Sequence, residues 1–148
     1  MSRSRQLWQR HKFKLNGLVL ILPFWFLYES LNISFPAALP KATLGPYEVT
    51  AMPLNEEGPY SHHGEWVKDY YLQWCAGCVE KIRQGFLLVS DTPPDLATLS
   101  QGHSSLLHGN KHGLHVHASM PAQTKAGDKL WLVIEDWQGQ VYSTHWVL

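Results

Sequence analysis

The sequence lacks the motifs that mark the common catalytic and nucleotide-binding sites. It contains no glycine-rich phosphate loop and no dinucleotide-binding fingerprint. Ser104, Ser105 and His108 lie near one another in the chain, but no nucleophile elbow surrounds them and no acidic partner accompanies them. Internal repeats and low-complexity tracts are absent as well. We therefore expect a protein that is not an enzyme.

Charge is also scarce, at 16% of the residues, and it is unevenly distributed. The first fifteen residues contain five basic and no acidic residues, whereas the rest of the chain contains seven basic and twelve acidic ones. Nucleic-acid-binding domains usually carry a basic patch or stripe. The acidic remainder of this chain has none, so we do not expect nucleic acid as a partner. The 148 residues, 45% of them hydrophobic, suffice for one ordinary globular domain.

Residues 16–34 form the longest apolar segment. As a helix with a rise of ~1.5 Å per residue it would cover roughly 28 Å, close to the thickness of a bilayer core. The basic residues before it favour a cytoplasmic N-terminus. We predict a basic cytoplasmic segment (1–15), a transmembrane anchor (16–34), a linker (35–44) and a periplasmic or extracellular β domain (45–148). With this arrangement, we expect the chain to be a single-pass protein of the inner (plasma) membrane. A cleaved signal peptide and a buried core helix are the alternatives.

Several short segments of the outer region have the composition of β-strands: residues 47–52, 66–74, 86–89 and 113–118. Residues 128–136 and 140–147, separated by a turn that contains Gly139, predict a β-hairpin. Six or so short strands favour a mainly β fold, a small antiparallel β-sandwich of immunoglobulin-like shape. The alternative is a small α+β domain in which residues 78–84 form a helix.

Histidine is abundant, with nine in the chain and five within fifteen residues: His103, His108, His112, His115 and His117. On a strand, His115 and His117 would point to one face with their Cα atoms about 6.5–7 Å apart. His108 or His112 could then supply a third nitrogen, and neutral imidazole is a ligand of zinc and copper. We predict a metal site that holds copper or zinc; a solvent-facing polar loop is the alternative. His62 and His63, in a polar loop over residues 55–64, could join it.

Cys75 and Cys78 are the only cysteines. Their spacing is compatible with a local disulfide, with thiolates that extend the metal site, or with a site of thiol–disulfide exchange. The sequence W-C-A-G-C at residues 74–78 resembles the thioredoxin active site, although the βαβ framework of that family has no counterpart here. Residues 75–82 resemble the C-x-x-C-V-x-x-I helix entry of heavy-metal-associated copper-transfer domains. Each likeness covers fewer than ten residues, so we transfer no function from either family.

Taken together, these features predict a membrane-anchored periplasmic accessory protein that binds copper or zinc for delivery, uptake or sensing. Its expected partners are the inner membrane and an envelope protein such as a metal transporter. Two other functions are compatible with the sequence. One is a non-catalytic docking subunit of an envelope or transport complex, and the other is a tethered thiol oxidoreductase that uses Cys75 and Cys78.

Overall fold

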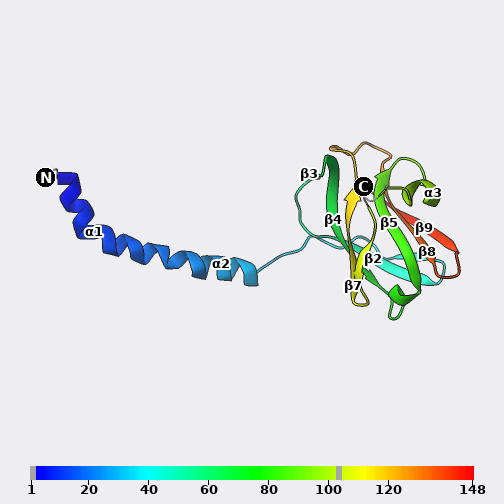
Figure 1. Ribbon diagram of the computed structural model, residues 1–148, viewed down its shortest axis with the longest axis horizontal. Coiled ribbons are helices and arrows are strands. Elements are labelled where there is room, and N and C mark those ends of the chain that lie inside the picture. The colour runs from blue at the N-terminus through cyan, green and yellow to red at the C-terminus, as the bar shows by residue number, and fades with distance from the viewer. Residues whose placement is uncertain (1–2, 103–104) are drawn as a thin grey trace. The chain divides into compact units, whose positions relative to one another are not determined.

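The computed structural model describes residues 3–102 and 105–148, which form two separate units. The first extends to Ser34 and is helical, and the second, Phe35–Leu148, contains all the strands. Figure 1 shows the helices of the first unit in blue and the strands of the second in cyan to red.

The first unit consists of two helices, α1 (Arg3–Val19) and α2 (Ile21–Leu31). They are separated at Leu20, whose backbone N–H donates to the carbonyl of Gly17 at 3.3 Å in a tight turn. Pro23 explains the position of this break. Proline has no N–H, so the carbonyl of Val19, four residues earlier, receives no helical hydrogen bond from it. The apolar segment is therefore divided between two helices.

This division corrects the transmembrane prediction. Within residues 3–102 and 105–148, the structure contains no helix that is both long and apolar enough to span a membrane. Helix α2 has 11 residues, or about 17 Å of length, against the roughly 30 Å of a bilayer core. Helix α1 is longer but carries the five basic residues of the N-terminus. The predicted anchor over residues 16–34 is wrong, and the single-pass localisation that depended on it is not supported.

The described part of the second unit contains one nine-stranded sheet. Its strands are β1 (Ala42–Leu44), β2 (Tyr47–Pro53), β3 (Tyr60–His62), β4 (Glu65–Trp74), β5 (Ile82–Ser90), β6 (His108–Asn110), β7 (Gly113–Ser119), β8 (Lys129–Asp136) and β9 (Val141–Val147). They follow the order β1-β2-β4-β7-β5-β8-β9, with β3 paired to β4 and β6 paired to β7. A 3₁₀ turn, η1 (Val79–Lys81), and a short helix, α3 (Leu96–Leu99), complete the unit.

The antiparallel sandwich is therefore also wrong, because the strands form one mixed sheet that curls until it is nearly a barrel. Strand β5 pairs with β7 in parallel, through Leu88 and Ser119, while the other pairings are antiparallel. The first and last strands, β1 and β9, come together. Near this junction the indole Nε1 of Trp146 donates to the carbonyl of Pro40 at 2.7 Å. A sandwich would instead need two separate sheets.

The hairpin of β8 and β9 is confirmed, with continuous antiparallel pairing from Lys129 opposite Val147 to Glu135 opposite Val141. The α+β alternative is wrong, because it required a helix over residues 78–84. Residues 79–81 form a single 3₁₀ turn, and the chain is extended from Ile82 onward as β5.

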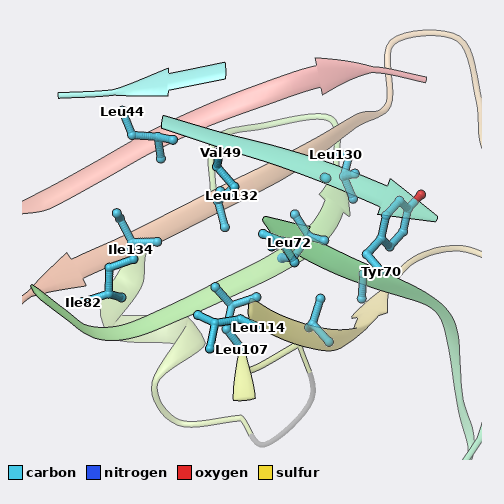
Figure 2. Packing of buried hydrophobic residues seen from close by; sticks show 14 of the residues in the cluster. Leu44, Val49, Tyr70, Leu72, Ile82, Leu107, Leu114, Leu130, Leu132 and Ile134 are labelled. Carbon is cyan, nitrogen blue, oxygen red and sulfur yellow. The ribbon is translucent and has the colours of Figure 1, made fainter. Parts of the chain in front are cut away.

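The hydrophobic core lies inside the curl of the sheet (Figure 2). Strand β4 contributes Tyr70 and Leu72, and β7 contributes Leu114 and Val116, each at most 9% exposed. Burial of an aliphatic side chain of this size contributes roughly 1.5–3 kcal/mol. Because side chains alternate along a strand, the intervening residues of β4 and β7 lie on the outer face of the sheet. That outer face holds the candidate site.

Candidate functional site: a histidine face on β3, β4, β6 and β7

The register of three neighbouring strands brings the first polar side chains together. Asp69 of β4 lies opposite His117 of β7, and Tyr71 lies opposite His115. His115 is in turn opposite His108 of β6. Directly opposed residues of antiparallel strands project to the same side of the sheet. The sheet thus places a carboxylate, a phenol and three imidazoles on one outer face.

Strand β3 adds two further side chains by folding back along β4. The turn between them consists of His63 and Gly64, both with positive φ, of 51° and 86°. Two such residues are typical of the type I′ turn that closes the tightest β-hairpins. The hairpin sets Tyr60 opposite Val67 and His62 opposite Glu65. The polar loop expected over residues 55–64 therefore ends in a strand that belongs to the site.

Five imidazole rings form a continuous array on this surface. The ring centroids of His63 and His62 are 4.3 Å apart, and His62 stacks on His117 at 4.9 Å. The array continues from His117 to His108 at 5.9 Å and from His108 to His115 at 3.9 Å. We call these five histidines, together with Tyr60 and Asp69, the histidine face.

Asp69 fixes the centre of the histidine face. The Nδ1 atom of His117 lies 2.5 Å from one of its carboxylate oxygens, and the hydroxyl of Tyr60 donates to the carboxylate at 3.0 Å. The side chains of His117 and Asp69 are 41% and 26% exposed. A carboxylate at Nδ1 orients an imidazole and favours the proton on that nitrogen. The ring of His117 is therefore held in place yet remains open to solvent.

Two pKa shifts show how the groups of the histidine face act on one another. Burial lowers the pKa of His115, and the positive charges of His108 and then His117 lower it further, against an opposing effect of Asp69. Burial also raises the pKa of Tyr60, and the hydrogen bond and charge of Asp69 act in the same direction. Protonation of His108 or His117 thus makes His115 harder to protonate.

Three of the five histidines predicted as metal ligands lie together in the structure. They are His108, His115 and His117. His112 lies in the turn between β6 and β7, where its backbone N–H donates to Asn110 Oδ1 at 2.9 Å and its carbonyl accepts from the Tyr71 hydroxyl at 2.8 Å. His103 lies outside the described residues.

The cysteines form a disulfide, Cys75–Cys78, just beyond the last residue of β4. The histidine face includes one residue of that strand, Asp69, whereas the disulfide follows the last residue of the strand. The interpretation of the cysteines as thiolates that extend the metal site is therefore not supported.

The predicted metal-binding group is corrected by this arrangement. Within residues 3–102 and 105–148 there is no group of three or more His, Cys, Asp or Glu side chains placed to hold a metal ion. The rings contact one another in stacked and edge-on pairs, and two ring nitrogens have other partners. His117 Nδ1 faces Asp69, and His108 Nδ1 lies 3.0 Å from the carbonyl of Leu106. Copper or zinc as a cofactor remains a prediction without a formed site.

Sequence reasoning missed Tyr60 and Asp69 altogether. A usable signal was present: Tyr60 and His62 alternate with small or polar residues before a His-Gly pair, and another aromatic segment follows. That pattern indicates a hairpin with a two-residue turn. Asp69 sits at the middle of a strand otherwise rich in aromatic and aliphatic residues, where a carboxylate is unusual.

The comparisons assign the chain to a family. The family model described as "Uncharacterised conserved protein UCP029505" matches residues 7–148. The chain belongs to this family. The match to UCP029505 includes every strand of the histidine face and the disulfide. No curated protein and no solved structure matches the chain, so the following proposals rest on geometry and chemistry.

Proposed function

We propose that this chain is a docking protein whose histidine face binds an acidic protein surface, most tightly below about pH 6. The observation that supports it is the array of five contiguous imidazoles, four of them on β3, β6 and β7 and the fifth, His63, in the turn after β3.

The charge of the histidine face sets the chemistry of its partner. Two carboxylates face the imidazoles, Asp69 beside His117 and Glu65 opposite His62. Protonation of the array therefore produces more positive charge than these carboxylates neutralise. An imidazole in water has a pKa of about 6.5, so acidification below neutral pH is the change that adds positive charge to a surface rich in histidine. A cationic patch attracts an acidic partner and accelerates its association.

The rigid strands that carry these side chains also favour binding. His115, His117 and Asp69 project from paired backbone, and His62 is held by a hairpin. Side chains on rigid elements lose less conformational entropy on binding than the same residues in a flexible loop. Tyr60 adds an aromatic ring of the type that is enriched at interfaces between proteins.

The direct test uses poly-L-glutamate as a defined acidic probe. Calorimetry of the full chain is performed at pH 5.5 and 7.5, at low ionic strength and with a metal chelator present. We expect binding at pH 5.5 that is at least about 10-fold tighter than at pH 7.5 and that weakens with added salt. Equal affinity at the two pH values would refute the proposal.

A matched pair of variants locates the effect. The variant His62→Gln, His115→Gln, His117→Gln removes three imidazoles from the histidine face, and His112→Gln, His145→Gln removes two that lie elsewhere. The first should lose the tighter binding at pH 5.5, while the second should keep it. Circular dichroism and thermal unfolding confirm that both variants are folded. Loss of pH dependence in the control, or its retention in the first variant, would place binding outside the histidine face.

A further inference from the structure

The Cys75–Cys78 disulfide presents its two sulfurs differently to solvent. Cys75 directly follows β4 and is half-buried, whereas Cys78 begins the η1 turn and is only 8% exposed. Cys78 packs in the hydrophobic core cluster, and Cys75 lies at the edge of that cluster. Cys75 is therefore the residue of the pair that a thiolate arriving from solvent meets first.

A cleft of about 270 Å³ leads to Cys75. Residues of the paired strands β2 and β4 line it, and Cys75 and Trp74 form part of its wall together with Glu48 and Lys41. Cys78 is not among its lining residues. Of the two cysteines, the cleft therefore exposes Cys75.

The backbone of β2 is placed to stabilise negative charge on Cys75. The N–H of Glu48 donates to the Sγ atom of Cys75 at 3.3 Å, and the carbonyl of Glu48 accepts from the backbone N–H of Cys75 at 3.0 Å. A hydrogen bond donated to a sulfur stabilises its thiolate more than its neutral form. The ammonium group of Lys41, paired with the Glu48 carboxylate, lies at the same cleft.

From this asymmetry we infer that the Cys75–Cys78 pair exchanges with a protein dithiol, with Cys75 as the sulfur that is attacked. A thiolate of the partner bonds to Cys75 Sγ, the Cys75–Cys78 bond breaks, and Cys78 leaves as a thiolate. The partner's second thiolate then attacks the partner's first sulfur, which is now bonded to Cys75 Sγ. The bond to Cys75 breaks, and Cys75 is released as a thiolate. The partner loses two electrons and two protons and becomes a disulfide. Cys75 and Cys78 gain these two electrons and two protons and become thiols.

Single-cysteine variants of the full chain test which sulfur reacts. Cys78→Ser leaves Cys75 as the thiol, and Cys75→Ser is the matched control that leaves Cys78. With oxidised glutathione at pH 7, we expect Cys75 to form the mixed disulfide about 10-fold faster than Cys78, because it is both more accessible and stabilised as a thiolate. Equal rates, or a faster reaction of Cys78, would overturn the inference.

The wild-type chain provides a test that does not depend on the variants folding. The oxidised protein is treated with excess reduced glutathione, quenched with acid during the reaction, and mapped by mass spectrometry. We expect a glutathione adduct on Cys75 that forms under native conditions. An adduct on Cys78 would overturn the assignment of Cys75 as the attacked sulfur. Reduction only after the chain is unfolded with guanidinium would identify the disulfide as a purely structural link. The histidine face shares no residue with this site, so either proposal can fail without the other.

Discussion

The β4–β7 pair has two faces that differ in almost every physical property. On the inner face Leu72 lies opposite Leu114, and both are within the hydrophobic core. Three residues earlier on β4, on the outer face, Asp69 lies opposite His117 and both side chains reach solvent. The two-residue period of a strand makes this separation possible. It implies that stability depends on the inner face and binding on the outer one, so that each can be altered while the other is kept.

The largest effect should come from the inner face. Leu72→Ala removes a side chain that is 0% exposed, and we expect it to lower the free energy of unfolding by about 3 kcal/mol, since a cavity is left in the core. The outer-face control His115→Gln should change it by less than about 1 kcal/mol. Denaturation with urea at pH 7.5 measures both. Losses of equal size would show that the two faces are not energetically separate.

The next effect concerns the ion pair at the centre of the histidine face. A double-mutant cycle with Asp69→Asn and His117→Gln should give a coupling energy of about 0.5–1 kcal/mol at pH 5.5, where imidazole is charged, because the pair is partly exposed. The coupling should shrink at pH 8. Unfolding curves of the four proteins at the two pH values provide the measurement. A coupling that does not depend on pH would contradict a change in the charge of this pair over the range.

The smallest effect is the pH dependence contributed by His115, whose pKa is lowered by burial and then by His108 and His117. In the range just below pH 6.5 the unfolded chain binds more protons at this residue than the folded one. Stability from this group is therefore present above about pH 6.5 and is lost as the pH falls toward the folded pKa. Because the ring is exposed, the loss should stay small.

The same shift can be observed directly by NMR titration of the His115 ring. Its pKa should rise toward the ordinary value in His108→Gln, which removes a neighbouring positive charge, and fall further in Asp69→Asn. A pKa that is unchanged in both variants would contradict the electrostatic coupling within the histidine face.

The sequence was sufficient to predict where several strands lie in the chain, but not how the strands are ordered in the sheet. The composition of residues 47–52, 66–74 and 113–118 correctly indicated β2, β4 and β7, and the glycine-containing turn indicated the β8–β9 hairpin. The order of the strands was not accessible, because the parallel pairing of β5 with β7 depends on contacts between residues far apart in the chain. An antiparallel sandwich was therefore the natural but wrong assembly of correct strands.

The errors in the N-terminal unit and in the site have a similar origin. The anchor predicted over residues 16–34 required a helix that continues past Pro23, but the carbonyl of Val19 loses its helical partner and the helix is broken there. The clustering of histidines between residues 103 and 117 identified three of the seven members of the histidine face, and His62 and His63 were named as possible additions. Tyr60 and Asp69 are brought in by the pairing of β3 and β7 with β4. Proximity in sequence could not reveal these two.

The most direct test of the account is NMR mapping of the acidic probe on the isotopically labelled full chain. Poly-L-glutamate added at pH 5.5 should shift the amide signals of β3, β6, β7 and residues 65–71 of β4, and the same addition at pH 7.5 should leave them nearly unchanged. Shifts centred on another surface, or shifts of the same size at the two pH values, would contradict the claim that the histidine face is a pH-dependent docking site.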